Sequence, residues 1–520
     1  MNRSQQIQQL KTTNHWDIII IGGGATGLGA AVDAAARGYK TLLLEQHDFG
    51  KGTSSRSTKL IHGGVRYLQQ GNFRLVRDAL RERGLLLKNA PHIAHRLKLV
   101  LPAYRWWEKL YYGLGLKVYN FLSAKLSLGP SEILSIKKTQ EYIKGLDGKK
   151  LSGGVAYYDG QFDDARLCVS LALTAADVSA TVLNYCRVAN LIHEQGKVAG
   201  VHIHDCLTEE TYEARGTVVI NATGVFVDDV LKMDDDGLTK TVSPSQGIHI
   251  VVEKTFFPGD QALFIPRTDD GRVLFAVPFH DKVIIGTTDT SVDTAVIEPL
   301  PLEDEVEFVI SHFNRYVHTG LKRSDVKSVF AGLRPLVKVP GQKKTAVLPR
   351  DHTIWVSKGG MINISGGKWT TYRKMAQEVI LKAHYEGGLA YTRCQTETMK
   401  LHGWMKKVDV EDPLYYYGSD AAAIRYLQHQ GFSQLIHPNL QYTIAEVVWA
   451  VGHEMAMTVE DVLARRTRAL ILDAKAAIEA APLVADIMMK ELNKDDVWKQ
   501  QQIAAFNEVA KGYVLGEVRS

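Results

Sequence analysis

The chain has 520 residues, of which 45% are hydrophobic and 23% charged, and its formal net charge is +5. The length allows more than one domain, and the composition is that of an ordinary soluble globular protein. Four scattered cysteines fit a reducing compartment better than a disulfide framework. The polar N-terminal stretch excludes a secretory signal, and no apolar run is long enough to predict a transmembrane helix.

Positive charge is concentrated in residues 51–110, which hold thirteen Lys or Arg against three Asp or Glu. Such an excess indicates an anionic partner, namely a phosphorylated ligand, a nucleic acid or a membrane surface. A solvated helix face explains about half of these charges equally well. Because no nucleic-acid-binding module accompanies them, we expect no nucleic-acid partner.

The first predicted elements form a β-α-β unit. DIIII (17–21) is apolar and β-branched, as expected of a buried parallel strand, and YKTLLLE (39–45) is a second strand. The sequence between them turns sharply at glycines into a helix, for which Gly38 is a suitable C-terminal residue.

The turn of this unit has the spacing of a dinucleotide-binding motif. Gly22, Gly24 and Gly27 form G-x-G-x-x-G, and Glu45 ends the second strand. Glycines let backbone N–H groups approach a pyrophosphate, and a carboxylate there accepts hydrogen bonds from a ribose. The motif alone is weak evidence, but its flanking elements agree with it. They predict dinucleotide binding and leave the dinucleotide open.

The segment GTSSRSTKLIHGGVRYL (52–68) follows directly on this unit. It holds five hydroxyl side chains, three glycines and three cations, so it is too polar for a core strand. Its glycine and serine content also argues against a helix.

Later elements divide into strands and then helices. Strands are predicted at 217–224, 249–253, 272–279 and 282–290, and the last three are expected to form a largely antiparallel sheet. From about residue 395 the pattern becomes helical, with capping boxes at Thr443 with Glu446 and at Thr458 with Asp461.

A second glycine motif occurs in ISGGKWTTYRKMAQEVI (364–380). Gly366 and Gly367 follow a short apolar strand and precede a helical pattern. A helix N-terminus formed by small residues suits the far end of a long cofactor, because it offers N–H groups and a positive dipole end. A simple strand-to-helix turn is the alternative.

Four motifs together resemble the FAD-dependent glycerol-3-phosphate dehydrogenases of the aerobic bacterial and mitochondrial type, which pass electrons to quinone. They are IGGGATGLGAAVDAAARG, GTSSRSTKLIHGGVRYL, SGGKWTTYRKMA and VEDVLARRTR, in the family's order from residue 17 to about 468. The resemblance implies a mixed α/β and α+β fold. Its parts are a Rossmann-like FAD-binding domain, an antiparallel-sheet substrate domain as in glycine and D-amino-acid oxidases, and a C-terminal all-helical domain.

The resemblance also implies domain limits. The FAD-dependent oxidoreductase domain is expected at 15–390 and the C-terminal helical domain at 395–520. Within the first, the FAD-binding segments are expected at about 15–90, 150–245 and 340–390, and the substrate segments at about 91–149 and 246–339.

Carried over position by position, the resemblance assigns three sets of site residues. The set for FAD is Gly22, Gly24, Gly27, Glu45, Thr53, Ser54, Ser55, Thr58, Lys59, His62, Gly63, Gly224, Gly366, Gly367 and Thr370. The substrate set is Arg66, Tyr67 and Arg350, and the catalytic set is His249, Arg334 and Lys368. No metal site is expected.

The chemistry agrees with these roles. Oxidation of a secondary alcohol requires a base for the hydroxyl proton, and a histidine titrates near neutral pH. A phosphate dianion requires convergent Arg and Lys donors. The alternatives are a core histidine at His249, a surface turn at Arg334 and simple packing of His62 beside the flavin.

The implied activity is oxidation of sn-glycerol 3-phosphate to dihydroxyacetone phosphate, with electrons passed to a membrane quinone at the cytoplasmic face. Rival hypotheses are an oxidase that uses oxygen, an amino-acid oxidase of the same fold, and a non-catalytic flavin-binding protein that docks on membranes. YRWWEKLYYGLGLKVYNF (104–121) has the composition of an interfacial segment, and a strand or helix packed over the substrate site is the equal alternative. We expect peripheral attachment to an anionic membrane surface and, as an assembly, a homodimer.

Overall fold

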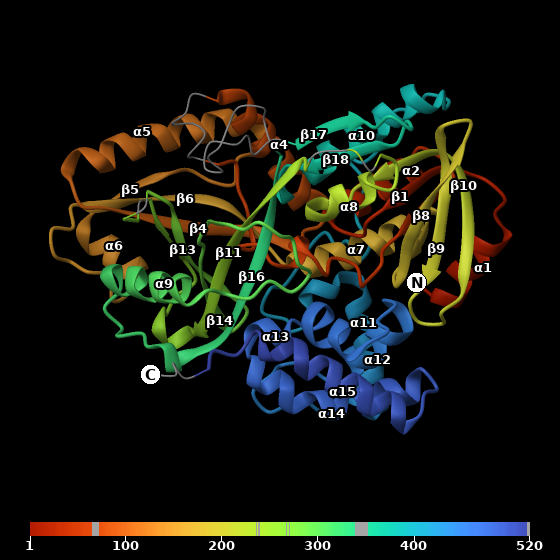
Figure 1. Cartoon of the computed structure of the whole chain (residues 1–520). Helices are drawn as coiled ribbons and strands as arrows, with labels where there is room; N and C mark the ends of the chain where they lie inside the picture. Colours follow the sequence, from red (N-terminus) through yellow and green to blue (C-terminus); the bar gives the residue numbers. More distant parts are fainter. Residues whose placement is uncertain are drawn as a thin grey trace.

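The computed structural model describes residues 1–64, 72–235, 237, 240–266, 268–269, 271–337 and 352–516. Two sheets, the helices that flank them and a layer of C-terminal helices make up this part of the chain. Figure 1 shows the C-terminal helices (blue) below the first sheet and the adjoining edge of the second. Within the described ranges, no helix has both the length and the apolar character that a bilayer span requires.

The first sheet carries the N-terminal β-α-β unit. Its strands follow the order β17–β18–β10–β1–β2–β7, and β9 and β8 extend from β10. β1 pairs in parallel with both β2 and β10, as its run of buried isoleucines predicts. The strands are β1 (Trp16–Ile21), β2 (Thr41–Leu44), β7 (Thr181–Leu183), β8 (Cys186–Glu194), β9 (Lys197–Asp205), β10 (Thr211–Asn221), β17 (His352–Val356) and β18 (Ile362–Gly366).

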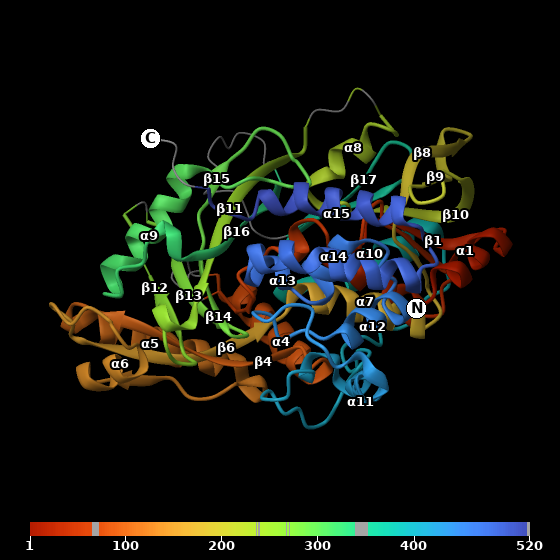
Figure 2. The same ribbon diagram turned by 90° about the horizontal axis from the view of Figure 1, so that it is seen from below.

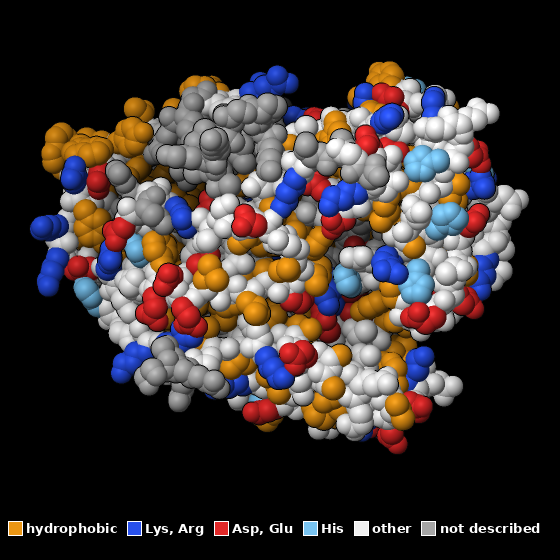
Figure 3. Space-filling view, viewed as in Figure 1, with side chains coloured by type: hydrophobic (Ala, Val, Ile, Leu, Met, Phe, Trp, Pro, Cys, Tyr) orange, Lys and Arg blue, Asp and Glu red, His pale blue; other side chains and the backbone are white. Residues whose placement is uncertain are grey.

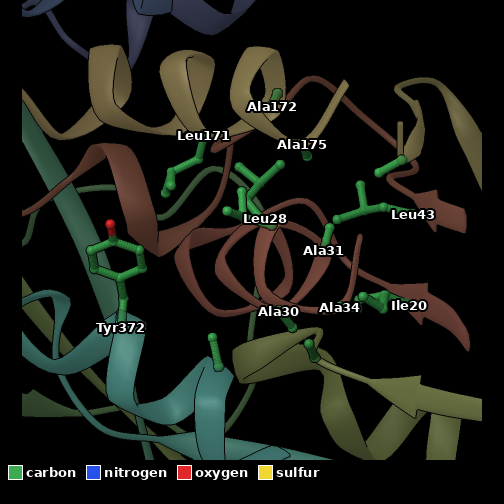
Figure 4. Packing of buried hydrophobic residues seen from close by; sticks show 14 of the residues in the cluster. Ile20, Leu28, Ala30, Ala31, Ala34, Leu43, Leu171, Ala172, Ala175 and Tyr372 are labelled. Carbon is green, nitrogen blue, oxygen red and sulfur yellow. The ribbon is translucent and has the colours of Figure 1, made fainter. Parts of the chain in front are cut away.

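Helix α2 (Ala25–Ala36) lies at the centre of the first core. It packs against α7 (Asp164–Asp177) and α10 (Tyr372–Gly387), and Figure 4 shows its alanines and Leu28 among residues of both helices. A Cβ at Gly29 would lie 2.9 Å from Cδ2 of Tyr372, so the glycine allows α10 to approach. Gly38 has a φ of +90° just after the helix, which confirms the predicted C-terminal residue.

The second sheet is mostly antiparallel and carries His249 and Arg334 of the predicted catalytic set. Its order is β15–β11–β14–β13–β12–β4–β6–β3, with β16 beside β11 and β5 beside β6. The strands are β3 (Leu60–Ile61), β4 (Ala94–Ala103), β5 (Glu132–Leu134), β6 (Gly153–Phe162), β11 (Val242–Glu253), β12 (Ala262–Ile265), β13 (Leu274–Phe279), β14 (Lys282–Gly286), β15 (Thr290–Ser291) and β16 (Val326–Val337).

The predicted antiparallel sheet is confirmed, since the strands expected at 249–253, 272–279 and 282–290 lie in β11, β13 and β14. The strand expected at 217–224 is the end of β10 and the turn after it. Two strands cross the predicted segment limits, because β3 and β6 come from FAD-binding segments and pair in the second sheet. The division into segments therefore stays a prediction.

The remaining helices pack against the two sheets and against one another. Those not yet given are α1 (Arg3–Thr12), α4 (Phe73–Asn89), α5 (Trp106–Ser123), α6 (Ile136–Tyr142), α8 (Val227–Leu231), α9 (Glu303–Tyr316), α11 (Ala421–Leu427), α12 (Ile444–His453), α13 (Ala469–Leu472), α14 (Ala474–Glu491) and α15 (Asp496–Lys511). The C-terminal helical layer contacts the elements of both sheets. Helix α13 packs against β16 of the second sheet (Figure 2). The π-helical turn η10 (Asp461–Arg466) lies against α7, which packs beside the first sheet's helix α2.

Both predicted capping boxes are confirmed. Thr443 and Glu446 cap α12 reciprocally. The N–H of Thr458 donates to the carboxylate of Asp461 at 3.0 Å, and the N–H of Asp461 donates to Oγ1 of Thr458 at 3.2 Å. Here the capped turn continues as η10.

Candidate active site

A cavity of about 400 Å³ lies where the strands of the first sheet end. β1, β2, β10 and β18 all have their carboxyl ends at this cavity, the usual ligand-binding edge of a parallel sheet. Its lining includes most of the residues predicted to bind the cofactor: Gly22, Gly24, Glu45, Thr53, Ser54, Gly224, Gly366 and Gly367.

The glycine motif leaves backbone where a side chain would block a ligand. Gly22 has a φ of +110°, in the region that disfavours side chains. A Cβ on Gly27 would lie 1.8 Å from the carbonyl oxygen of Gly22, so the helix start can pack closely only on a glycine. Gly24 is the N-cap of α2 and supplies no capping side chain. This open helix end fits the pyrophosphate of a dinucleotide such as FAD.

Glu45 stands at the end of β2 on the cavity wall. Its carboxylate accepts hydrogen bonds from the N–H groups of Gly23 (2.7 Å) and His47 (2.8 Å). Burial raises the pKa of Glu45, while these two bonds act in the opposite direction. The two N–H groups hold the acid at the place where the motif expects a ribose.

The polar segment 52–64 is fastened to the cavity by its own hydroxyl and backbone groups. Oγ of Ser54 accepts from the N–H of Ala25 at 2.9 Å, and Nε1 of Trp369 donates to the carbonyl of Ser54 at 2.8 Å. Oγ1 of Thr370 donates to the carbonyl of His62 at 3.3 Å. The two glycine-containing motifs are therefore tied together across 315 residues of sequence.

We predict that Gly27→Ala lowers FAD affinity at least about tenfold, because the new Cβ forces the Gly22 turn and the helix start apart. The measurement is the ratio of flavin to protein absorbance after dialysis. Gly452→Ala in α12 is the matched control, since its Cβ would meet nothing within 4 Å. Full flavin retention in Gly27→Ala would contradict this role of the motif.

A second cavity of about 250 Å³ adjoins the first and shares Thr53, Pro335 and residues 366–369 with it. It lies between segment 52–64 and strands β11 and β16 of the second sheet. Its lining brings together Thr58, His62, His249, Arg334, Lys368 and Thr370 from the predicted sets. The sequence separates these residues widely, so only the fold gathers them.

His249 is a buried, oriented imidazole. Its Nε2 lies 2.9 Å from Oγ1 of Thr58, and its ring stacks on Phe330 with centroids 4.9 Å apart at 16°. Among the described residues, no hydrogen-bond partner reaches its Nδ1. Burial lowers the pKa of His249 well below its usual value, and the charges of Lys59 and Arg334 act in the same direction. The imidazole is therefore neutral at pH 7.

Arg334 is held at the cavity by three neighbouring residues of the β14–β15 turn. Its Nη2 donates to Oγ1 of Thr287 (3.1 Å) and the carbonyl of Thr288 (3.0 Å), and its Nη1 lies 3.3 Å from the carboxylate of Asp289. Its side chain remains 27% exposed. A Cβ on Gly247 would lie 2.4 Å from Nη2, so that glycine makes room for the guanidinium.

Arg56 is a cation of this cavity that the predicted sets omit. It lines the second cavity, is 7% exposed, and pairs with Glu298 at 2.7 Å. Its position in the TSSRS sequence could have indicated that it lines the cavity. Its positive charge did not distinguish it from Lys59, which lines neither cavity. Residues 187–189 and Thr223 also line the first cavity and carry no motif.

Four predicted cofactor residues, Gly27, Ser55, Lys59 and Gly63, line neither cavity. The ammonium of Lys59 donates to the carbonyl of Ser55 (2.8 Å) and to both oxygens of Asp164 (2.8 and 2.7 Å). These bonds use all three donors of the ammonium, and the place of Lys59 in the FAD site stays a prediction. Ser55 is buried beside it, and the N–H of Gly63 donates to the hydroxyl of Tyr119 at 2.7 Å. Arg66, Tyr67 and Arg350 lie outside the described residues.

Comparisons with known proteins agree with this site. Residues 17–373 match the family model of FAD-dependent oxidoreductases, and residues 359–502 match that of the C-terminal domain of alpha-glycerophosphate oxidase. The fold is also that of a glycine oxidase from Geobacillus kaustophilus, with a TM-score of 0.54 at 18% identity over 76% of this chain and 100% of the other. The chain is an FAD-dependent oxidoreductase, and its cofactor is FAD.

The narrower family follows from closer relatives. The mitochondrial glycerol-3-phosphate dehydrogenase of Homo sapiens is 38% identical over 99% of this chain and 75% of its own length. The glycerol-3-phosphate dehydrogenase from Bacillus halodurans, solved in complex with FAD, superposes with a TM-score of 0.81 at 29% identity, over 100% of this chain and 99% of the other. The chain belongs to the family of FAD-linked glycerol-3-phosphate dehydrogenases.

Proposed function

We propose that this protein oxidises sn-glycerol 3-phosphate to dihydroxyacetone phosphate and passes the electrons to a membrane quinone. The observation that carries the proposal is the second cavity, in which a neutral histidine and the cations Arg334 and Lys368 face one space beside the glycine turn of residues 366–367. A small phosphorylated alcohol requires this combination of base and anion-binding groups.

Each residue has a part in this reaction. Arg334 and Lys368 bind the phosphate, with Arg334 aimed by Thr287 and Asp289. His249 accepts the proton of the reacting hydroxyl, because its lowered pKa leaves the imidazole unprotonated at neutral pH. FAD supplies the acceptor for the hydride from the same carbon. Burial of the imidazole against Phe330 keeps water from competing for the base.

The central test is anaerobic addition of glycerol 3-phosphate to the purified flavoprotein. We expect the flavin absorbance to bleach, whereas an amino acid of similar size leaves it unchanged. Bleaching only by an amino acid would support an amino-acid oxidase, and no bleaching by either compound would support a non-catalytic flavin-binding protein.

Oxygen is a second candidate for the electron acceptor. It is favoured by the match of residues 359–502 to the C-terminal domain of alpha-glycerophosphate oxidase. Peroxide yield in air, compared with reduction of a soluble quinone analogue, decides between the two acceptors. We expect quinone reduction to exceed peroxide formation.

The membrane part of the proposal rests on helix α5. Its apolar side chains at 106, 107, 110, 111, 114, 118 and 121 point outward, and we call them the α5 patch. Trp106, Leu114 and Phe121 are 70%, 67% and 83% exposed. Figure 3 shows apolar side chains gathered over this helix. The opposite face is buried through Leu116 and Tyr119, so the exposed stripe fits peripheral attachment to the inner face of the cell membrane.

We predict that Leu114→Glu with Phe121→Glu lowers binding to anionic phospholipid vesicles by about a hundredfold or more. Each of these side chains contributes ~1.5–3 kcal/mol when it is buried in an apolar medium. Vesicle sedimentation measures the binding, and bleaching by substrate is expected to be unchanged. Val497→Glu, at another exposed apolar position (64% exposed), is the control. Unchanged binding of the double variant would remove α5 from the membrane contact.

A further inference from the structure

A buried carboxylate outside both cavities joins three parts of the chain. Asp164, the first residue of α7, is fully buried. Its oxygens accept from Nζ of Lys59 (2.8 and 2.7 Å), from the N–H and hydroxyl of Ser57 (2.9 and 2.7 Å), and from Nη2 of Arg468 (3.1 Å). Arg468 comes from the VEDVLARRTR motif of the helical domain, which the proposed reaction leaves without a role.

These bonds hold the residues on either side of Thr58. Ser57 is fixed through two groups, and Lys59 is fixed through its ammonium at a φ of +61°, which a lysine rarely adopts. Both Lys59 and Arg468 also donate to the carbonyl of Ser55, at 2.8 and 3.0 Å. Asp164 and its two cations therefore restrain the main chain on both sides of Thr58.

Thr58 links the restrained main chain to the imidazole of His249. Its hydroxyl is the group that lies 2.9 Å from Nε2 of His249. On the other side, Nζ of Lys59 lies 5.2 Å from the centroid of Phe330, the ring that stacks on His249. One charged cluster thus contacts both neighbours of the imidazole.

We propose that Asp164 is a positioning residue for the oxidation: with Lys59 and Arg468 it fixes Thr58, and through Thr58 it sets the orientation of His249. The proposal rests on the proposed function of His249 as the base. By this route the helical domain takes part in the active site, although none of its described residues lines either cavity.

A double-mutant cycle in the full-length flavoprotein tests the proposal. Thr58→Val removes the hydroxyl at nearly constant shape, Asp164→Asn weakens the cluster, and the double variant combines the two changes. We expect each single change to lower the limiting rate of flavin reduction about tenfold to a hundredfold, since a small misplacement of a reacting group has this effect. We expect the double variant to be no slower than Thr58→Val, and FAD content and substrate Kd to be unchanged.

Rescue and control variants complete the design. Thr58→Ser keeps the hydroxyl and is expected to restore most of the rate. Asp48→Asn is the matched control, because Asp48 is also buried and bound by two arginines of the helical domain but forms no hydrogen bond or ion pair with residues 55–59. If Asp164→Asn does not fold, Ser57→Ala, which removes one bond to the carboxylate, replaces it in the cycle.

Two results would overturn the proposal. They are losses that add in the double variant, and a loss in Asp48→Asn as large as that in Asp164→Asn. Either result, obtained while the wild type bleaches normally and His249→Gln does not, leaves the proposed function intact. Rapid bleaching of His249→Gln would instead count against the role of His249 itself.

Discussion

Arg334→Ala is expected to slow flavin bleaching by micromolar glycerol 3-phosphate strongly while the variant keeps its FAD. The guanidinium faces the second cavity from β16, and its loss removes a charge-assisted contact to the phosphate. Removing one member of such a buried pair costs about 3 kcal/mol, which is about a hundredfold in kcat/KM. Stopped-flow reduction across a substrate series measures the effect.

Two further arginine variants make the result specific. Arg334→Lys keeps the charge but loses the forked geometry, so a smaller loss is expected. Arg323→Ala removes an arginine that pairs with Glu303 at 2.6 Å in the same half of the molecule but lines neither cavity. The role of Arg334 would be refuted by loss of flavin in Arg334→Ala, or by an equal loss of rate in Arg323→Ala.

His249→Gln is expected to lower the limiting rate of flavin reduction by about a hundredfold to ten-thousandfold, the usual contribution of a positioned base. Glutamine fills similar space but does not take up the proton. In the wild type the base form of His249 is lost only as pH falls through a pKa well below 6.5. The limiting rate should therefore stay constant down to pH 6.5 and decline below it.

The pH profile gives this prediction a second readout. The acid decline of the limiting rate should disappear in His249→Gln, since the group that titrates has been removed. The control is His312→Gln, which changes another buried histidine of the second sheet's half, on α9. A wild-type decline centred above pH 6.5 would contradict the effect of burial on His249.

Local patterns were sufficient for the parts of the fold that depend on neighbouring residues. The isoleucines of 17–21, the glycine turn and Glu45 predict the β-α-β unit because each acts within a few residues. Both capping boxes follow from spacings of three residues. The pairing of β11 with β16, and that of β3 with β6, joins residues about 80 to 100 apart, and no local pattern specifies such partners.

Local sequence patterns are also insufficient to predict which residues meet in the active site. His249, Arg334 and Lys368 were recognised by family motifs, and the fold brings them to one cavity. For the cation Lys59, charge indicates the need for an anionic partner but not which one. That partner, Asp164, lies 105 residues away in an unremarkable helix start. Arg56, in the same motif, has a similar sequence context and faces the cavity instead.

The buried ion pairs between the helical layer and the rest of the chain have a consequence for how the protein is divided. Asp48 accepts from Arg465 and Arg466, and Asp164 accepts from Arg468. A chain cut near residue 395 would leave Asp48 without both of its arginines and Asp164 with Lys59 as its remaining cation. Stranding a buried charge such as that of Asp48 costs ~3–5 kcal/mol. A whole domain is commonly stable by only ~5–15 kcal/mol, so a loss of this size is a large part of the free energy of unfolding. The cut would therefore divide the chain into two parts that do not fold independently. We expect the two halves to unfold together, because the VEDVLARRTR motif supplies the arginines that join them.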